Sequence, residues 1–356
     1  MQPAIRFILS LFVLTLFSQS GFGQLFDEST RLKYDTNYIK VYKDELTSRV
    51  YLSRKQNGIN ISEKLIKPGL KYKTNDNLLL GLGYTYSFLN INLAVKVPFI
   101  NSDDDVYGES KYMDLSIQTN FRSFMIDLYL QWSSGYYLSN PEDFQAVHID
   151  GAPLPIRGDM RTTLVVASVQ YLFNSKRYSY KASFLQNEFQ KRSAGTPIVG
   201  AEAYWMLCMA DTALSPYTNI GHVYVSENPY NQTDLFNFGV NGGYAYTFVW
   251  NELLYISLAS TFGLAGGYHV VHNTWDYNTL NEGFSVGVTN NTKISVGFNN
   301  NTYYVGVSYV RYSVSQLMGS SGDWMTYWSG NIRFNVVKRF NLKRTIKILR
   351  PDLWIL

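Results

Sequence analysis

The sequence has few of the residues that mark several common classes of protein. Its 356 residues include one cysteine, Cys208, and four histidines, and only 16% of the residues are charged. A lone cysteine excludes a disulfide scaffold and a cysteine-rich zinc or iron–sulfur site. The net charge of +4 is too small to predict a nucleic-acid surface, which needs clustered basic residues. We therefore expect no nucleic-acid partner.

Long apolar runs are also lacking beyond the first residues. After residue 23, no segment approaches the roughly 20 apolar residues that a membrane-spanning helix needs. This excludes a polytopic helical membrane protein. A hydrophobic content of 46% and an aromatic content of 16% exclude a disordered chain. A soluble all-β protein and a transmembrane β-barrel remain.

Residues 1–23 have the pattern of a cleaved signal peptide. Arg6 is the only charge before Asp27, the eleven residues 7–17 are mostly apolar, and Gly21 and Gly23 precede the expected cleavage site. An N-terminal membrane anchor is the alternative, but eleven residues are too few to span a bilayer. We expect an exported chain.

Period-two alternation along the rest of the chain predicts an all-β fold. Many alternating segments run ten residues or more, close to the ~9–11 tilted residues that cross a bilayer. Their polar faces carry Asn, Ser, Gln, Thr and Gly rather than Lys and Glu, which favours a barrel lumen over a water-facing surface of a soluble sandwich. We therefore predict an antiparallel transmembrane β-barrel in a Gram-negative outer membrane. The clearest segment has apolar residues at Phe236, Phe238, Val240, Tyr244, Tyr246, Phe248 and Trp250.

The spacing of these segments predicts a barrel of 12–14 strands. Fourteen follow if residues 59–73 form the first strand and residues 217–225 form a crossing, and twelve if residues 217–225 are a loop. Weaker alternation over residues 178–189 is counted as a strand. The predicted divisions are a signal peptide over 1–23, an N-terminal segment over 24–58, the barrel over 59–338 and a basic tail over 339–356. Within the N-terminal segment, residues 47–56 are either an extra strand or an inward-folded piece.

Four short motifs spread along the chain resemble a known family. They are Asp35-Thr36-Asn37-Tyr38-Ile39, Asp103-Asp104-Asp105 followed by Tyr107-Gly108, Lys191-Arg192-Ser193-Ala194-Gly195, and Gly242-Gly243-Tyr244-Ala245-Tyr246. They resemble the Bacteroidota family catalogued as domain of unknown function 4421. The resemblance implies an exported outer-membrane barrel of Bacteroidota, and it brings no assigned activity and no catalytic residue.

Charged residues at inward positions are the main candidates for a functional site. In a narrow barrel such charges pair and fill the lumen, whereas in a wider barrel they line a water path. The sequence leaves both arrangements open. The predicted lumen charges are Lys96, Asp114, Asp127 and Lys181.

Three adjacent carboxylates, Asp103, Asp104 and Asp105, form a possible divalent-cation loop. Ca²⁺ binds several carboxylate oxygens, so in an outer loop these residues could hold ions that crosslink lipopolysaccharide. The alternative is a hydrated acidic loop tip. His269 and His272 with Asp276 fall in one predicted outer loop, but a spacing of three places strand residues on opposite faces. We predict no enzyme activity, no resident metal and no cofactor.

These observations support three functions in descending order. The first is a porin-like passive channel or small-solute transporter. The second is an occluded structural or assembly barrel that acts through its outer loops. The third is a barrel enzyme acting on lipid or peptide. Outer-membrane lipid, lipopolysaccharide and the barrel-assembly machinery are the expected partners, and the sequence does not indicate an oligomeric state.

Overall fold

The computed structural model describes residues 34–42, 45–62, 69–86, 89–97, 100, 103–120, 122–144, 155–214, 229–273, 278–318 and 322–341. The predicted signal peptide, the candidate crossing at 217–225, Asp276 and the tail beyond residue 341 lie outside these ranges. No helix within them is long and apolar enough to cross a membrane.

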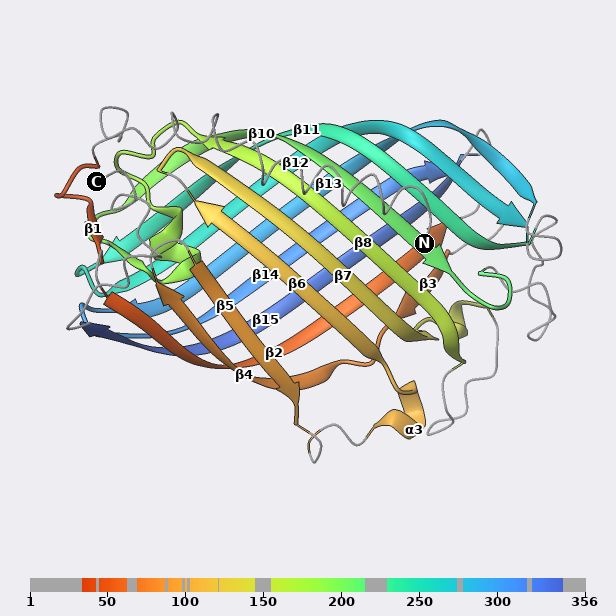
Figure 1. Ribbon diagram of the computed structural model, residues 1–356, viewed down its shortest axis with the longest axis horizontal. Helices are drawn as coiled ribbons and strands as arrows, with labels where there is room; N and C mark the ends of the chain where they lie inside the picture. Colours follow the sequence, from red (N-terminus) through yellow and green to blue (C-terminus); the bar gives the residue numbers. More distant parts are fainter. Residues whose placement is uncertain are drawn as a thin grey trace, which may run out of the picture.

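Ten antiparallel strands form a closed ring (Figure 1). The ring closes because β15 pairs with β2 along the whole length of both strands. We call the end where β2 begins and β15 ends the proximal end, and the opposite end the distal end. In ring order the strands are β2 (Glu45–Ser62), β3 (Leu70–Lys73), β7 (Phe124–Leu138), β8 (Ile156–Leu172), β10 (Ala194–Met209), β11 (Tyr230–Trp250), β12 (Leu254–Asn273), β13 (Thr279–Asn299), β14 (Tyr303–Met318) and β15 (Asp323–Asn341).

Three further strands widen the wall in its proximal half. β4 (Asn77–Tyr86) continues from β3 along β2, and β5 (Leu89–Lys96) pairs with β4. β6 (Lys111–Asn120) pairs with β7. The short helix α3 (Asp104–Tyr107) lies between β5 and β6 in the chain, and a 3₁₀ turn, η2 (Pro141–Phe144), follows β7. The wall between β2 and β7 is therefore the single short strand β3 distally and the three strands β4, β5 and β6 proximally.

The segment between β8 and β10 folds into the proximal end of the ring instead of crossing. It contains the π-helix η3 (Lys181–Leu185) and β9 (Glu188–Gln190). β9 pairs with β1 (Ile39–Val41), which precedes the barrel. We call residues 174–192 the plug.

Alternation within each strand decides which side chains face the lumen. In β11, Asn237 is fully buried, whereas its neighbour Phe238 is 62% exposed. Successive strand residues point to opposite faces, so one register buries Asn237, Asn241 and Thr247 and exposes Phe238, Val240 and Phe248. The lumen and the outer wall are therefore both encoded by the period of two.

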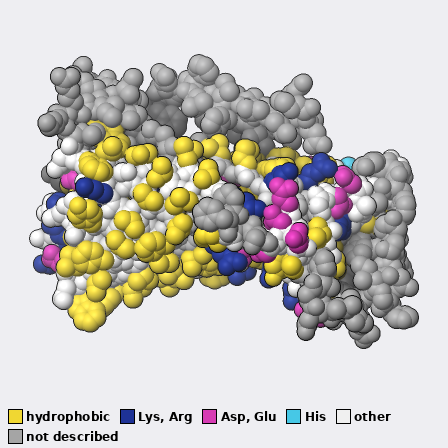
Figure 2. Space-filling model, turned by 90° about the horizontal axis from the view of Figure 1, so that it is seen from below, with side chains coloured by type: hydrophobic (Ala, Val, Ile, Leu, Met, Phe, Trp, Pro, Cys, Tyr) yellow, Lys and Arg dark blue, Asp and Glu magenta, His cyan; other side chains and the backbone are white. Residues whose placement is uncertain are grey.

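The outer wall has an apolar belt over its proximal half. Figure 2 shows apolar side chains gathered at one end of the molecule, with acidic and basic side chains toward the other end. A continuous exposed apolar band of this kind is typical of the lipid-facing wall of a transmembrane barrel. Outward-facing members of the belt include Leu82, Leu93, Leu115, Val240, Phe262, Leu264, Val296 and Phe334.

The predicted all-β antiparallel barrel is confirmed, but the distribution of its strands differs from the prediction. Residues 178–189 form part of the plug and not a crossing. Apolar and polar side chains alternate in this segment because one face of the plug packs against the inside of the ring. The strands β4, β5 and β6 cover only the proximal half of the wall, so the closed ring has ten strands although the sheet contains thirteen.

The bounds of the barrel also differ from the expected 59–338. Residues 59–73 span a strand end and a new strand, since β2 ends at Ser62 and β3 begins at Leu70. The first barrel strand starts at Glu45, so residues 47–56 are strand and not an inward-folded piece. At the other end, β15 continues to Asn341 and includes part of the predicted basic tail.

Candidate functional site

The lumen is the candidate site, and its inward side chains fill it in three layers. The plug occupies the proximal end. A polar layer follows, and the distal half holds a mainly apolar layer together with buried polar side chains such as Gln316 and Asn237. The polar layer consists of Asp127, Gln170, Glu202, Asn241, Thr289 and Lys293, all of them buried.

An ion pair crosses the lumen within the polar layer. Lys293 Nζ lies 3.5 Å from Asp127 Oδ2, and their side chains are 7% and 2% exposed. Asp127 is on β7 and Lys293 is on β13, which are five strands apart in one direction around the wall and seven in the other, through β4, β5 and β6. The pair therefore joins opposite walls of the barrel. Lys293 also donates to the hydroxyl of Tyr180 from the plug, which ties the polar layer to the plug.

Glu202 is the second buried carboxylate of the polar layer. It accepts hydrogen bonds from Asn241 Nδ2 at 2.9 Å and from the hydroxyl of Thr289. Asn241 in turn accepts from Gln170 Nε2 at 3.4 Å. Four strands thus contribute to one hydrogen-bonded group, and buried polar side chains are stable only when bonded in this way.

Two buried arginines hold the plug at the place where the ring closes. Arg49 on β2 donates to the carbonyl of Leu185 at 2.8 Å. Arg339 on β15 donates to the carbonyl of Gln186 at 2.8 Å through one amino group and at 3.2 Å through Nε. Gln186 ends η3 in a left-handed conformation with φ of 58°, an uncommon conformation for a residue other than glycine. The two arginines bind carbonyls that the helix end leaves without partners.

The N-terminal segment fastens the plug from the proximal side. Besides the β1–β9 ladder, Asp35 N donates to Lys176 O at 2.8 Å, and Lys191 N donates to Tyr38 O at 2.7 Å. Tyr42, just after β1, lies under the Arg339 guanidinium, 4.4 Å from its ring centre. Burial raises the pKa of the Tyr42 hydroxyl above its ordinary value, so it stays protonated and donates to Asn300 O at 3.3 Å.

The distal half of the lumen is closed by apolar and tyrosine side chains. Residues from β2, β3, β7, β8, β10, β11, β12, β14 and β15 meet in one buried cluster. Tyr72 donates across it to Leu214 O at 3.0 Å. Close packing of this kind leaves little room for water. The cluster includes Ile59, Ile61, Tyr72, Tyr136, Met160, Leu164, Tyr204, Met206, Cys208, Leu235, Val314 and Tyr327.

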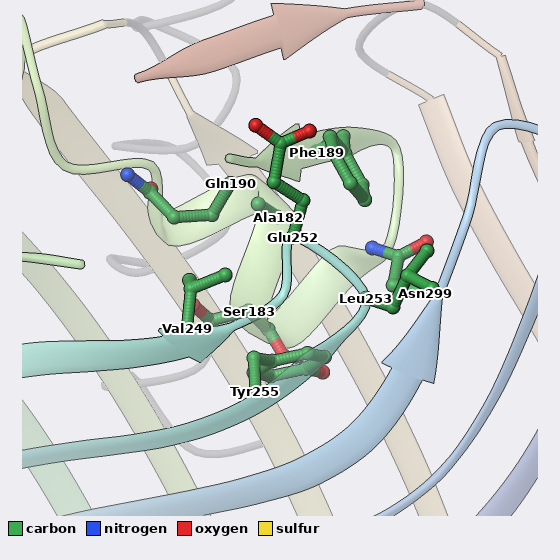
Figure 3. A pocket seen from close by; sticks show the side chains of 9 residues that line it. All are labelled: Ala182, Ser183, Phe189, Gln190, Val249, Glu252, Leu253, Tyr255 and Asn299. Carbon is green, nitrogen blue, oxygen red and sulfur yellow. Dashed lines mark hydrogen bonds between the residues drawn. The ribbon is translucent and has the colours of Figure 1, made fainter. Parts of the chain in front are cut away.

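A small pocket lies where the plug meets the proximal rim (Figure 3). Its volume is about 10 Å³, which is room for one water molecule. The plug supplies Ala182, Ser183, Phe189 and Gln190, and the rim supplies Val249, Glu252, Leu253, Tyr255 and Asn299. The pocket is too small for a substrate.

The four predicted lumen charges do not form one group. Asp127 lies in the polar layer, whereas Asp114 on β6 pairs with Lys55 on β2. Lys96, the last residue of β5, pairs with Asp104, the first residue of α3, at 3.2 Å. Lys181 begins η3 and is on the plug, not on a barrel strand as predicted.

The acidic loop packs against the break between β3 and β4. The Asn75 side chain donates to Asp103 at 3.2 Å and to Asp104 at 2.9 Å. Asp104 therefore has both an amide and the Lys96 ammonium as partners. In the described ranges, no three His, Cys, Asp or Glu side chains are arranged to hold a metal ion.

The two histidines of the predicted outer loop lie in a strand instead. β12 extends to Asn273, so His269 and His272 are near its distal end. His269 is 1% exposed and His272 lies on the opposite face of the strand. The strand is longer than predicted because Gly266 and Gly267 are accommodated within its ladders.

Several residues of the site did not stand out in the sequence. Lys293 and Glu202 fall in segments with weak alternation. Arg49 and Lys55 alternate with outward residues of β2, but the predicted barrel begins only at residue 59. The signal that could have found them is the inward series Thr47, Arg49, Tyr51, Ser53, Lys55 and Asn57, all of which are buried.

Comparison with solved structures finds other barrels of low similarity. The outer membrane protease OmpT of Escherichia coli is 8% identical, with 84% of this chain and 98% of that chain covered and a TM-score of 0.35. The translocator domain of the autotransporter NalP of Neisseria meningitidis is 6% identical, with 82% and 88% covered and a TM-score of 0.31. A deletion mutant of TodX, a monoaromatic hydrocarbon channel, is 8% identical, with 84% and 91% covered and a TM-score of 0.29.

Comparison with curated proteins finds no match. A family model, in contrast, matches residues 33–340, from just before β1 to the end of β15, and its description is Domain of unknown function (DUF4421). The match covers the plug, the polar layer and the whole ring. The chain is therefore a β-barrel protein that belongs to the DUF4421 family.

Proposed function

We propose that this chain is an occluded outer-membrane barrel that acts through its distal half, and not an open passive channel. The observation that carries the proposal is the Asp127–Lys293 pair, which joins opposite walls of the ring. The plug lies on the proximal side of this pair and the apolar layer on the distal side.

The size of the ring supports this reading. Rings of about eight strands are just wide enough for side chains to fill, and open aqueous channels are found at about sixteen or more. The wall has ten strands at the level of β3 and twelve at the level of the plug and the polar layer, so at both levels it is smaller than the open channels. A hydrated ion would have to separate a buried ion pair and then pass an apolar cluster, and each step is costly. The filled lumen thus favours the second expected function over the first.

The distal half is suited to contacts outside the membrane. Its wall carries ion pairs, among them Arg161–Asp211 at 3.0 Å and Lys71–Asp143 at 3.9 Å. Long connections at this end are typical of the outer face of bacterial barrels. We place the chain in a Gram-negative outer membrane after export, with lipid, lipopolysaccharide and the barrel-assembly machinery as its neighbours. An enzyme role gains no support, since His269 and His272 lie on opposite faces of β12.

A liposome-swelling assay tests occlusion with small neutral solutes. Liposomes that contain the refolded protein should not swell in arabinose. A variant in which residues 178–190 are replaced by a Gly-Ser linker of equal length should allow only slow swelling, because the distal apolar layer remains. Rapid swelling with the unmodified protein would contradict the proposal.

A further inference from the structure

The barrel wall has a seam between β5 and β6. β5 pairs with β4 and β6 pairs with β7, but no ladder joins β5 to β6 in the part of the chain that the structure describes. Figure 1 shows the two strands drawing apart toward α3. The seam is therefore a wedge that is narrow near the proximal end and wider toward the middle of the wall.

The seam lies within the apolar belt. Leu93 and Val95 on β5 are 72% and 68% exposed, and Met113 and Leu115 on β6 also point outward. In lipid, a strand edge without a partner leaves backbone groups without hydrogen bonds, which is unfavourable because the bilayer core has no water to replace them. Closed barrels normally avoid such edges. A seam at this depth thus indicates a place where the wall opens to the bilayer.

Three cationic side chains lie on the lumen side of the wall behind the seam. Arg49 extends across β4 to Asn92 on β5, with its terminal nitrogen 3.5 Å from the Asn92 oxygen. Lys55 reaches Asp114 on β6. Between them, the Arg333 guanidinium lies 4.3 Å from the ring centre of Tyr51. We call Arg49, Lys55 and Arg333 the seam cluster. Its contacts extend from β5 to β6.

Two glycines of β4 leave room for side chains of β2 to extend across β4 toward β5. A Cβ at Gly81 would collide with the Tyr51 ring, and a Cβ at Gly83 would collide with the Arg49 side chain. Without side chains at these positions, Arg49 and Tyr51 lie across β4 and approach β5. The arrangement thus depends on particular residues of two neighbouring strands.

The seam cluster has an excess of positive charge. Its three cations have one carboxylate partner, Asp114, and no salt bridge joins Arg49 or Arg333 to a carboxylate within the described ranges. Arg49 is 3% exposed, and its Nε is buried without a hydrogen-bond partner. Burying uncompensated cations is costly. An anion bound beside them would remove that cost.

Space for a ligand is present at the same place. Ala94 on β5 and Asp114 and Ser116 on β6 face inward by the strand alternation, yet all three are exposed. They are inward residues of the two seam strands, so the lumen is accessible next to the seam while it is filled elsewhere.

We propose that the seam admits an anionic amphiphile from the bilayer and that the seam cluster binds its headgroup. The ligand class is a phosphate-bearing lipid. Its phosphate lies against Arg49 and Arg333, which suit planar, bidentate recognition of phosphate oxygens. Its acyl chains stay between β5 and β6 in the belt. This binding site goes beyond the proposed occlusion, since a lipid can bind at the wall whether or not the lumen conducts ions.

Native mass spectrometry of the protein in a neutral detergent tests the proposal. The probes are dihexanoyl phosphatidic acid, dihexanoyl phosphatidylcholine and inorganic phosphate. Phosphatidic acid should bind as a single adduct, and Arg333→Gln and Arg49→Gln should each weaken it about tenfold or more, because a hydrogen bond to a charged group is lost. Arg161→Gln, which removes an arginine of the distal wall, should leave binding unchanged. Heat-dependent gel migration confirms that each variant is folded.

Three results would overturn the proposal. If the Arg49 and Arg333 variants bound phosphatidic acid as tightly as the unmodified protein, the seam cluster would be excluded as the binding site. If phosphatidylcholine bound as tightly as phosphatidic acid, selection of the ligand by its negative charge would be excluded. Equal binding of inorganic phosphate would mean that the site does not require an amphiphile.

The route through the seam is tested by fluorescence quenching. A bimane fluorophore at Ala94→Cys should be quenched by doxyl-labelled phosphatidic acid, and Arg333→Gln should reduce that quenching. The same fluorophore at Phe262→Cys, which lies in the belt on β12, should respond to bulk lipid and not to Arg333→Gln. Identical responses at the two positions would overturn entry at the seam. Conductance by the unmodified protein would contradict occlusion and leave these binding results unaffected.

Discussion

The ammonium of Lys293 makes the contact that spans the barrel. It lies between Asp127 on the opposite wall and Tyr180 on the plug, and it is almost completely buried. A buried ion pair contributes little net stability, but loss of one partner leaves the other charge buried and unpaired. The effect of a substitution here is therefore dominated by the partner that remains.

Lys293→Met should lower the free energy of unfolding by about 3 to 5 kcal/mol, because Asp127 then has no cation. The double variant Asp127→Asn/Lys293→Met should recover a large part of this loss, since no charge is left buried. Thermal unfolding in detergent, followed by gel migration, measures both effects. Lys338→Met, which changes a lysine at the exposed end of β15, serves as the control. Equal destabilisation in the single and double variants would contradict the cross-lumen pairing.

Sequence alone identified one half of this pair. Asp127 faces inward in a clearly alternating segment, whereas Lys293 lies in a run of Asn and Thr with weak contrast between faces. The alternation of residues along β13 could have shown that Lys293 faces inward. The pairing itself could not have been predicted, because it depends on which strands face each other after the ring closes, and that is set by the number of strands.

At the scale of the element, the plug is held at the end of η3. Arg339 makes four hydrogen bonds, two of them to Gln186 O and the others to Asn299 and Asn300. Removal of the guanidinium leaves those carbonyls buried with fewer donors. The plug has few other contacts with β15, so the consequence should be local.

Arg339→Gln should increase amide hydrogen exchange in residues 181–190 without changing exchange in β11 to β13. Hydrogen-exchange mass spectrometry resolves this difference, because local opening exposes only the affected segment. Lys338→Gln provides the matched control on the same strand. Unchanged exchange in the plug would mean that Arg339 does not hold it.

The β15–β2 ladder closes the ring and fixes where the barrel begins. Thr326 lies opposite Asn60, and both side chains face outward. The double variant Asn60→Cys/Thr326→Cys should form a disulfide on mild oxidation, detected by loss of thiol labelling. Gln56→Cys/Thr326→Cys should not, since Gln56 lies opposite Gly330 and the thiols are then four residues apart along the ladder. Cys208 is buried and does not interfere.

Two elements show where periodicity is insufficient. Residues 178–189 alternate like a strand, yet they pack as a π-helix and a short strand because their apolar face meets the inside of the ring instead of lipid. Residues 59–73 alternate although they overlap β2 and β3, which run antiparallel, so the reversal of chain direction is hidden in an apparently continuous pattern. Alternation indicates that one face of a segment is buried. It does not indicate whether that face is covered by the inside of the ring or by lipid.

At the scale of the whole molecule, the apolar belt covers the proximal half of the wall and, on β11 to β13, extends distally to Phe236, Tyr268 and Phe284. Strands as long as β11 and β13, with 21 residues each, exceed what is needed to cross a bilayer. In the proposed placement, the excess length carries the distal ends of the strands beyond the bilayer. The sequence predicted the barrel and its outer face, because both follow from alternation, but the depth of the belt depends on strand tilt.

Surface labelling of intact cells tests this arrangement. Asp211→Cys, at a distal position where the side chain is 71% exposed, should react with a membrane-impermeant maleimide. Val169→Cys, which lies in the belt, should react only after the membrane is dissolved. Labelling of Val169→Cys on intact cells, or protection of Asp211→Cys, would place the membrane elsewhere on the wall.

Single-channel conductance of the refolded protein in a planar bilayer tests the central claim most directly. The account predicts a silent bilayer for the unmodified protein, with folding confirmed by heat-dependent gel migration, because the plug, the Asp127–Lys293 pair and the apolar layer close the lumen in series. Discrete conductance steps from the unmodified protein, with an ion selectivity that changes in Asp127→Asn, would show an open pore lined by Asp127 and would contradict the occluded barrel.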